Sequence, residues 1–326
     1  MPHSHHSHSG QFCKHAVGTL EDVVKQAIAQ RFEVFGLTEH VPRYREADLY
    51  LEEQGLSLNA LYQQFISFLQ EAQRLKVQYA TQISLLVGLE TEFITPRDLV
   101  GLSEILTEQQ SSIDYIVGSI HHVNGIPIDF DEPTYQQALA SFSQDGDGEG
   151  DSRDNPLEKF LLAYFDAQYE LLQRFKPELV GHIDLCRLYT PDLKFMDYPQ
   201  VWKRIELNVK FAVSYGALFE INAAAFRKKQ VVVYFQYPSS LATNFFFQLI
   251  LKNGGRFALS DDSHGPHAVG LNYDRAYEYL KLLNVTELWY LEPSTEPNYA
   301  GRKVRAVKLE NWSSHLFWTS VLAGRR

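Results

Sequence analysis

Hydrophobic and polar positions along the chain alternate between two kinds of segment. Short runs rich in β-branched and aromatic residues are typical of buried strands, and longer runs with a helical apolar period are typical of amphipathic helices. We expect strands at 32–38, 83–90, 113–120, 178–184, 218–222, 256–260 and 287–292. We expect helices at 19–31, 57–79, 157–175, 199–215, 239–253 and 273–284. Strands that alternate with helices predict repeated βαβ units and a largely parallel sheet.

One segment departs from this alternation. Residues 141–156, SFSQDGDGEGDSRDNP, are rich in glycine, serine and aspartate and contain almost nothing to bury. We interpret them as a flexible acidic insertion on the surface, between elements of one fold. A chain of 326 residues is long for a single domain, but (β/α) barrels of this size are common. We therefore expect one barrel domain over residues 1–326.

Composition and charge narrow the class of protein. Hydrophobic residues make up 45% of the chain, which is enough for a buried core, and the formal net charge is −10. This charge argues against a nucleic-acid partner, which normally requires a basic face. The two cysteines do not make a disulfide framework, and we find neither a secretion signal nor an apolar run of membrane-spanning length. We expect a soluble cytoplasmic protein without nucleic-acid or membrane partners, whereas the sequence leaves its oligomeric state open.

Histidine and acidic residues follow the predicted strands at the points where these end. The C-terminal ends of parallel strands open onto one face of a barrel, where catalytic residues collect. Side chains that are far apart in sequence are therefore expected to converge. The group consists of His40, Glu90, His121, His122, His182, Asp262 and His264.

Two pairs at alternate positions point to metal binding. His6 with His8, and Asp262 with His264, would each direct two side chains to the same side of an extended chain. Imidazole nitrogens and carboxylate oxygens suit zinc, manganese or iron, and a carboxylate can bridge two ions. A single histidine at a strand end is more often structural, and a histidine-rich tail can bind metal adventitiously. Neither alternative explains histidines at successive strand ends, so the sequence predicts a metal site.

The motifs HSHHSHSGQFCKH, GLTEHVPR, GSIHHVNG, GHIDLCRL, EINAAAFRK and SDDSHGP together resemble a known family. They are similar to the PHP (polymerase and histidinol phosphatase) superfamily, and within it to the fungal type of histidinol-phosphatase. The resemblance covers nearly the whole chain. It implies an α/β fold, a distorted (β/α)7 TIM-like barrel of the PHP type, with two or three divalent metal ions. It also implies a metal-dependent phosphatase that hydrolyses L-histidinol phosphate to L-histidinol and phosphate in histidine biosynthesis.

The resemblance also implies a set of metal ligands. The first ion would be held by His6, His8, Glu90 and Asp262, the second by Glu90, His121 and His182, and the third by His15, His40 and His264. The sequence leaves two points open. His3-Ser4-His5 repeats the His-x-His pattern, so either pair could supply the ligands. His122 could lie behind the ligands or touch the substrate.

Phosphate binding and proton transfer have their own candidates. An arginine fork can bind two phosphate oxygens at once, and the resemblance implies this role for Arg187 and Arg227, with Arg43 as a weaker candidate. Each could instead be a solvated surface arginine. Asp262 and His264 are the nearest catalytic candidates for handling protons.

Four more residues lie close to these motifs. Glu220 and Asn222, which alternate on one strand face, could meet the amino-alcohol end of the substrate or form hydrogen bonds in the core. Cys13 and Cys186 have no evident His–Asp relay to activate a thiolate. We therefore expect both cysteines to be small buried residues.

Other functions remain as alternatives. One is a PHP phosphoesterase that acts on another small phosphate ester or on a nucleic-acid end, against which the acidic charge argues. A barrel amidohydrolase or deaminase also begins with His-x-His, but such sites commonly use a modified lysine, and no predicted strand end offers one. A metal-binding protein without activity would be expected to have lost ligands, whereas this chain has the full set.

Overall fold

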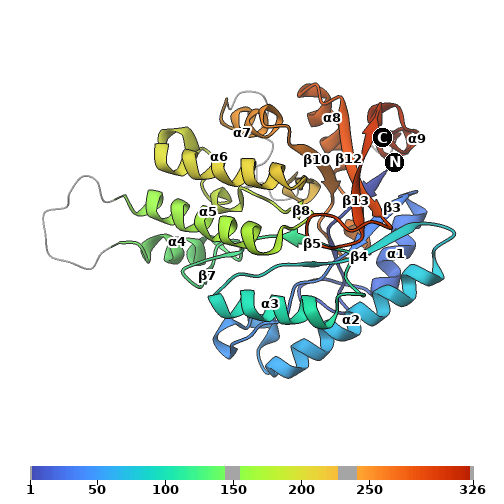
Figure 1. The fold of residues 1–326 in the computed structure, drawn as a ribbon, viewed down its shortest axis with the longest axis horizontal. Helices are drawn as coiled ribbons and strands as arrows, with labels where there is room; N and C mark the ends of the chain where they lie inside the picture. Colours follow the sequence, from blue (N-terminus) through green and yellow to red (C-terminus); the bar gives the residue numbers. More distant parts are fainter. Residues whose placement is uncertain (1, 144–154, 227–240, 324–326) are drawn as a thin grey trace, which may run out of the picture.

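A nearly closed barrel of parallel strands forms the centre of the computed structural model, which describes residues 2–143, 155–226 and 241–323 (Figure 1). In spatial order its strands are β1 His3–Ser4, β3 Val34–Leu37, β4 Ser84–Glu90, β5 Tyr115–Gly118, β8 Leu179–Val180, β9 Leu218–Asn222 and β10 Arg256–Ser260. Every neighbouring pair in this order is parallel. The expected distorted (β/α)7 architecture is confirmed.

Helices surround the barrel. They are α1 Leu20–Ala29, α2 Leu58–Gln78, α3 Pro96–Glu108, α4 Glu132–Ala140, α5 Pro156–Phe175, α6 Pro199–Ser214, α7 Leu241–Lys252, α8 Tyr273–Leu282 and α9 Leu316–Ala323. Single 3-10 turns lie at η1 Glu46–Asp48, η2 Leu51–Glu53, η3 Leu185–Arg187, η4 Phe195–Asp197, η5 Ala223–Phe226, η6 Pro266–Ala268 and η7 Trp312–Ser314. The sequence prediction missed α3, α4 and α9. None of the helices in the described residues is long and apolar enough to cross a membrane.

Helix starts follow local capping chemistry. Thr19 accepts a hydrogen bond from the backbone N–H of Asp22, whose carboxylate in turn accepts from the Thr19 backbone, so α1 begins with a capping box. Asn155 caps α5 by accepting from the N–H groups of Leu157 and Glu158. The predicted insertion therefore lies between the end of α4 and this cap. Its residues 144–154 are outside the described part of the chain, and both its flexibility and the single-domain organisation stay predictions.

The seventh barrel strand differs from the expectation. The predicted strand at 287–292 exists as β12 Glu287–Pro293, but it forms an antiparallel hairpin with β13 Val304–Glu310. The N-terminal β1 completes the barrel instead, with His3 beside Val34 of β3. A two-residue strand made of histidine and serine carries no hydrophobic period, which explains why the pattern did not reveal it.

Side chains close the gap between β1 and β10. The N–H of Leu259 donates to Nε2 of His3 over 2.9 Å. The Ser4 hydroxyl donates to Oδ1 of Asp261 over 2.9 Å and accepts from the Asp261 N–H over 3.1 Å. The first residues of the chain are thereby fixed to β10, a strand near the C-terminal end of the chain.

The barrel interior is filled by a small apolar cluster below the strand ends. Tyr115 lies at its centre, where Gly36 and Gly88 leave room for the ring: a Cβ on Gly36 would lie 2.0 Å from the tyrosine oxygen. The Tyr115 hydroxyl donates to the carbonyl of His5 over 2.7 Å and so anchors the N-terminal segment. The remaining members are Val34, Leu86, Val117, Leu179, Leu218 and Ala258 from the strands and Tyr290, Leu291 and Val304 from the hairpin.

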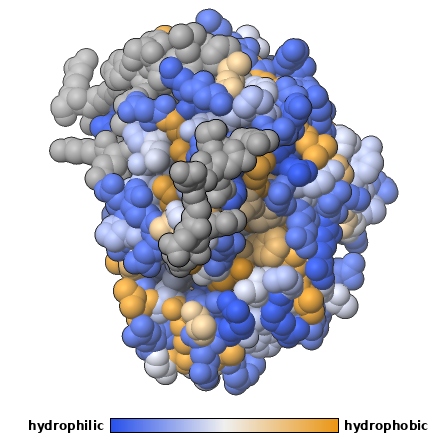
Figure 2. Space-filling view, turned by 90° about the vertical axis from the view of Figure 1, so that its left-hand side faces the viewer, coloured by the Kyte–Doolittle hydropathy of each residue, from blue (hydrophilic) through white to orange (hydrophobic). Residues whose placement is uncertain are grey.

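The larger core lies between the strands and the surrounding helices. Phe35 of β3, Phe68 of α2 and Phe165 of α5 are fully buried in it. On the described part of the face shown in Figure 2, hydrophilic residues predominate and hydrophobic residues occur in small groups. The barrel is therefore held by apolar packing on both faces of its strands, which gives the strand ends fixed positions.

Candidate metal centre

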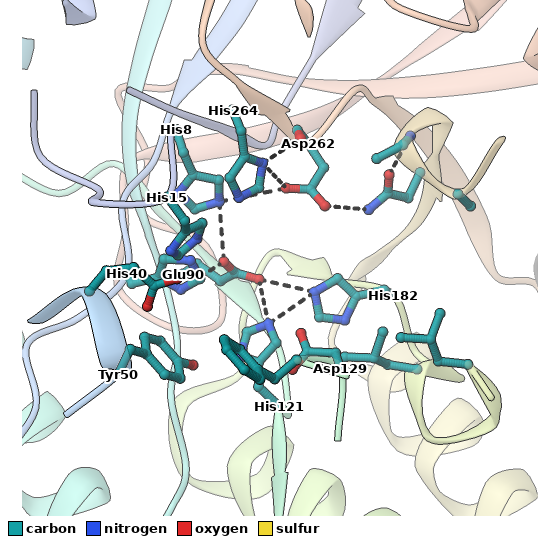
Figure 3. Close-up of a pocket in the computed structure, with 17 residues that line it drawn as sticks. His8, His15, His40, Tyr50, Glu90, His121, Asp129, His182, Asp262 and His264 are labelled. Carbon is teal, nitrogen blue, oxygen red and sulfur yellow. Dashed lines mark hydrogen bonds and ion pairs between the residues drawn. The ribbon is translucent and has the colours of Figure 1, made fainter. Parts of the chain in front are cut away.

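Polar side chains converge on a cavity of about 500 Å³ at the C-terminal ends of the barrel strands (Figure 3). Glu90 is the last residue of β4, and His40, His121 and His182 follow β3, β5 and β8. Two short strands, β2 Ser7–His8 and β11 Ser263–His264, pair in parallel and set His8 beside His264. The structure brings all nine predicted ligand side chains into this one cluster: His6, His8, His15, His40, Glu90, His121, His182, Asp262 and His264.

Glu90 lies between two pairs of imidazoles. Its Oε2 is 3.1 Å from Nε2 of His6 and 3.3 Å from Nε2 of His8. Its Oε1 is 3.2 Å from Nε2 of His121 and 3.0 Å from Nε2 of His182. Oε2 is also 3.1 Å from Nδ1 of His40. One carboxylate oxygen thus faces His6, His8 and His40 and the other faces His121 and His182, an arrangement suited to a carboxylate that bridges two ions.

Asp262 reaches the same cluster through an unusual backbone conformation. Its φ of 45° is in the left-handed region, which costs free energy for a residue with a side chain and is typical of functional sites. Its Oδ1 lies 3.7 Å from Nε2 of His6 and 3.6 Å from Nε2 of His8. Asn222, the last residue of β9, donates to the other oxygen over 3.2 Å. The carboxylate is thereby held toward the first pair of imidazoles.

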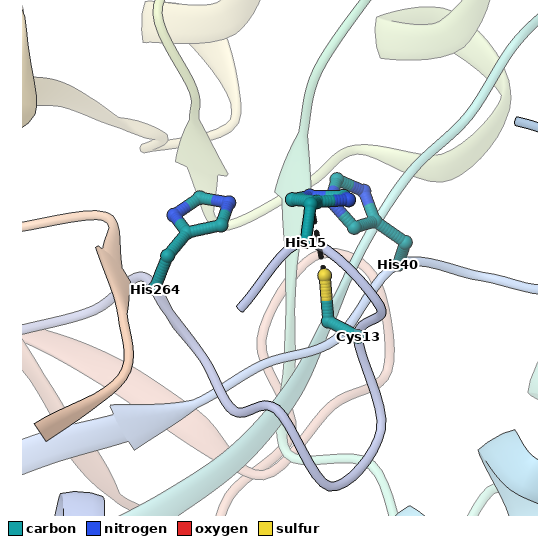
Figure 4. Close-up of side chains that lie close together, drawn as sticks. All are labelled: Cys13, His15, His40 and His264. Atoms are coloured by element: carbon teal, nitrogen blue, oxygen red, sulfur yellow. Dashed lines mark hydrogen bonds between the residues drawn. The ribbon is translucent and has the colours of Figure 1, made fainter. Parts of the chain in front are cut away.

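A third group lies beside these two. Cys13, His15, His40 and His264 each place one ligand atom within 4.8 Å of the others (Figure 4). The thiol of Cys13 is buried and its Sγ is 3.2 Å from Nε2 of His15. Burial raises the pKa of this thiol far above its usual range, which disfavours a free thiolate nucleophile.

A second layer of carboxylates orients the imidazoles. Nδ1 of His6 hydrogen-bonds to Glu220 over 2.8 Å, and Nδ1 of His8 hydrogen-bonds to Glu39 over 3.3 Å. A proton on Nδ1 leaves the lone pair on Nε2, the nitrogen that faces Glu90, and such carboxylate–histidine pairs are typical behind metal ligands. Glu220 also accepts from the His182 N–H over 2.7 Å, so it positions two of the imidazoles.

Glu92 also belongs to this second layer and lies behind imidazoles of the second and third groups of proposed ligands. One of its oxygens is 3.3 Å from Nδ1 of His121, and the other is 3.2 Å from Nδ1 of His40. The sequence reasoning missed Glu39 and Glu92 and gave Glu220 a different candidate role. A signal for two of them was present, because Glu39 directly precedes His40 and Glu92 lies two positions after Glu90, just past the end of β4.

The electrostatics of this cluster favour positive charge at its centre. Burial alone would lower the pKa of His8, but Glu39 and Glu90 outweigh it and raise that pKa to about 9. Burial would raise the pKa of Glu90, but the imidazoles of His6, His121 and His40 hold it well below its usual value. At His264, farther from Glu90, burial dominates and lowers the pKa to about 3, so this imidazole stays neutral with a lone pair available.

These donors fit divalent cations. The buried carboxylates Glu39, Glu90, Glu92 and Glu220 and the adjoining Asp262 outnumber the single guanidinium that the described structure places among them, that of Arg43. Oε2 of Glu90 is enclosed and accepts no well-oriented hydrogen bond from any described residue. Such a buried charge is costly unless it is paired or coordinates metal.

The two arginines that can be located do not line the cavity. Arg43 is buried behind it, 3.4 Å from Glu92 and stacked 4.2 Å over the ring of Tyr50. Arg187 on η3 is also buried and donates to the carbonyl of Pro191 over 2.8 Å. Both guanidinium groups thus have protein partners outside the cavity lining, and their role in phosphate binding stays a prediction. Arg227 lies outside the described residues.

Three further histidines close to the cluster contact other parts of the protein. His3 accepts from Leu259 as described above, and Nε2 of His5 accepts from the N–H of Leu291 over 2.9 Å. The geometry therefore places His6 and His8, rather than His3 and His5, in the cluster. His122, on β6 His122–Val123, lies with its Nδ1 3.5 Å from Glu92 and outside the cavity lining. This strand forms a hairpin with β7 Ile126–Pro127.

The barrel and its histidine–carboxylate cluster agree with comparisons to known proteins. Residues 4–224 match the PHP domain family, and the chain belongs to this family. The resemblance seen in the motifs is thereby confirmed. The chain is 44% identical to a Schizosaccharomyces pombe protein named "Probable histidinol-phosphatase", over 96% of both chains. It is 33% identical to the histidinol-phosphatase of Saccharomyces cerevisiae, over 98% of this chain and 100% of the relative.

Solved structures agree on the fold. The histidinol phosphate phosphatase of Lactococcus lactis, whose structure contains zinc, L-histidinol and phosphate, aligns with a TM-score of 0.61 and 19% identity, over 93% of this chain and 98% of its own. A Listeria monocytogenes protein aligns with a TM-score of 0.65 and 19% identity, over 84% of this chain and 99% of its own. At this identity the likeness supports the barrel architecture.

Proposed function

We propose that the chain is a histidinol-phosphatase, which hydrolyses L-histidinol phosphate to L-histidinol and phosphate in histidine biosynthesis. The two yeast relatives that match almost end to end carry this activity in their names. The observation that carries the proposal is the position of Glu90, with one oxygen toward His6 and His8 and the other toward His121 and His182. This is an arrangement suited to two adjacent divalent ions.

We assign the ligands in three groups. The first ion would be held by His6, His8, Glu90 and Asp262, the second by Glu90, His121 and His182, and the third by His15, His40 and His264. Divalent ions in these positions would neutralise the phosphoryl oxygens and lower the pKa of water toward neutrality. Zinc, manganese and iron all suit such donors, and two or three ions can be accommodated.

The chain's own groups supply orientation and proton handling. Asn222 fixes one oxygen of Asp262, and Nδ1 of His264 hydrogen-bonds to the Asp262 carbonyl over 3.0 Å. These two residues, Asp262 and His264, are the proposed catalytic groups for handling protons during the reaction. Apolar side chains, Leu185 and Leu188 among them, also line the cavity.

The three candidate arginines differ in how well their positions suit phosphate binding. Arg227 stays a candidate for phosphate binding, and so does Arg187, although one of its nitrogens donates to Pro191 in this structure. The position of Arg43 against Glu92 and Tyr50 instead supports a role in fixing the second layer of carboxylates.

Substrate turnover tests the function directly. We expect kcat/KM for L-histidinol phosphate to exceed that for a nucleoside monophosphate by about 100-fold or more, a difference of about 2.7 kcal/mol in transition-state binding. Single-stranded DNA should not be cleaved, because the chain carries a net charge of −10. Comparable kcat/KM values for the three substrates, or a preference for DNA, would favour another PHP phosphoesterase.

Asp129 is the proposed partner of the cationic end of the substrate. It lines the same cavity and is only partly buried, whereas Glu220 is fully occupied by His6 and His182. We expect Asp129→Asn to raise KM for L-histidinol phosphate about tenfold with a smaller change in kcat, because a charge-assisted hydrogen bond is lost. Steady-state kinetics measure this. The KM for a phosphate ester without an amine is the control, and an equal rise for both substrates would contradict the assignment.

The cellular location stays a prediction, and the oligomeric state stays open. The two cysteines, Cys13 and Cys186, are unpaired, in line with the reducing compartment expected from the sequence.

A further inference from the structure

We propose that Cys13 is a fourth protein ligand of the third ion and that this position therefore selects zinc over manganese. The inference rests on the metal centre proposed above, and it adds a sulfur donor to a site that the sequence assigned to three histidines. In the binding step a metal–sulfur bond forms, the S–H bond breaks, and the thiol proton passes to solvent.

The geometry of the third group carries the proposal. One ligand atom from each of Cys13, His15, His40 and His264 lies within 4.8 Å of the others, and the sulfur is 3.2 Å from Nε2 of His15. Zinc has bond lengths of about 2.3 Å to sulfur and about 2.1 Å to nitrogen, so two such ligands at a tetrahedral ion are separated by about 3.6 Å. The four donors therefore need only small shifts to surround one ion.

Backbone hydrogen bonds hold the sulfur in this position. The N–H groups of Phe12 and Cys13 donate to the Ser9 carbonyl over 3.1 and 2.8 Å, and the N–H of Ala16 donates to the Cys13 carbonyl over 3.1 Å. These bonds fold residues 9–16 into consecutive tight turns. Figure 4 shows the side chain of Cys13 pointing from this loop toward His15. A ligand held on a fixed loop loses little conformational freedom when the ion binds.

The surroundings of the two cysteines differ. Cys186 is fully buried and belongs to the main hydrophobic core, as expected of a small apolar residue. Cys13 is not a member of that core and faces imidazoles, and the carboxylate of Glu39 is also close to it. A thiol used only as apolar filler gains nothing from such neighbours, whereas a thiolate among them requires a cation.

Sulfur changes which metal the site prefers. Thiolate is a soft donor that favours zinc, whereas manganese prefers carboxylate and water oxygens. Three imidazoles and one thiolate would also complete a four-coordinate shell, the closed arrangement typical of tightly held zinc. The first and second positions have only nitrogen and oxygen donors and would still accept either zinc or manganese. We therefore expect a preparation loaded with manganese to keep zinc at the third position.

Cobalt substitution tests the ligation without relying on activity. In cobalt-loaded wild-type protein we expect a thiolate-to-cobalt charge-transfer band in the near ultraviolet. Cys13→Ser should lose this band and bind one ion at least tenfold more weakly, as measured by metal analysis during titration. Cys186→Ala is the matched control and should keep both the band and the ion. X-ray absorption of the zinc protein should show one sulfur per three zinc ions.

The outcomes separate this inference from the proposed function. A wild-type protein that binds three ions without the band, or a Cys13→Ser variant that keeps it, would overturn the sulfur ligand and leave the phosphatase assignment standing. The band could be lost only in Cys13→Ser while the protein does not hydrolyse L-histidinol phosphate. This outcome would support the sulfur ligand and overturn the proposed substrate. A chain that binds no divalent metal would overturn both. Circular dichroism of the variants checks that they are folded.

Discussion

Glu90→Gln is expected to lower kcat for L-histidinol phosphate by about 10³-fold or more. The amide keeps the shape of the side chain but removes the charge that lies between His6 and His8 on one side and His121 and His182 on the other. Metal ions contribute several kcal/mol to such a reaction, and about 1.36 kcal/mol corresponds to a factor of ten. Steady-state kinetics measure the loss.

The same variant should also lose more than one ion, because Glu90 is the proposed ligand that two positions share. Metal analysis of the purified protein checks this, and His15→Ala, which touches only the third position, should lose a single ion. Glu310→Gln on the exposed end of β13 is the matched control and should match wild type in both measurements. Near-normal turnover in Glu90→Gln would contradict the bridging role.

Removal of the metal by a chelator should abolish turnover and also destabilise the fold. Without cations, Glu39, Glu92 and Glu220 remain buried around Glu90 with too little positive charge among them. Breaking a buried ionic arrangement typically costs about 3–5 kcal/mol, which would lower the melting temperature by about 4–7 °C in a chain of this size. Thermal unfolding with and without chelator measures the shift.

Zinc added back to the chelated protein is the control and should restore both activity and melting temperature. The stabilisation should grow with the logarithm of the zinc concentration, as expected for a ligand that binds only the folded state. Full activity in protein shown by metal analysis to be metal-free would exclude a metal-dependent mechanism.

The barrel and the convergence of the site could be predicted because both follow from short-range patterns. Apolar runs marked six of the seven barrel strands, and parallel strands necessarily bring their C-terminal ends to one face. Glu90, His182 and Asp262 could therefore be expected near one another although they are far apart in the chain. β1 could not be found this way, since His3 and Ser4 have no apolar period and their burial depends on Leu259 and Asp261.

The second layer of the site depended on contacts that no local pattern reveals. The direction of a guanidinium is set by its tertiary partners, so the stacking of Arg43 on Tyr50 and the hydrogen bond of Arg187 to Pro191 could not be read from the sequence. The position of Cys13 beside His15 depends on the turn that starts at Ser9. The only hint in the sequence was that Cys13 lies two positions before His15, a candidate ligand.

Closure of the barrel by side chains has a consequence for synthesis of the protein. Ser4 and Asp261 are 257 residues apart, and His3 and Leu259 are 256 apart. The segment that leaves the ribosome first can pair with β3 early, but its contacts with β10 must wait for one of the last strands. Contacts this distant form slowly, because a long loop must close before any of them can form. A nascent or truncated chain that ends before β10 would thus possess most of the histidines but lack Asp262, His264 and the contacts that close the barrel.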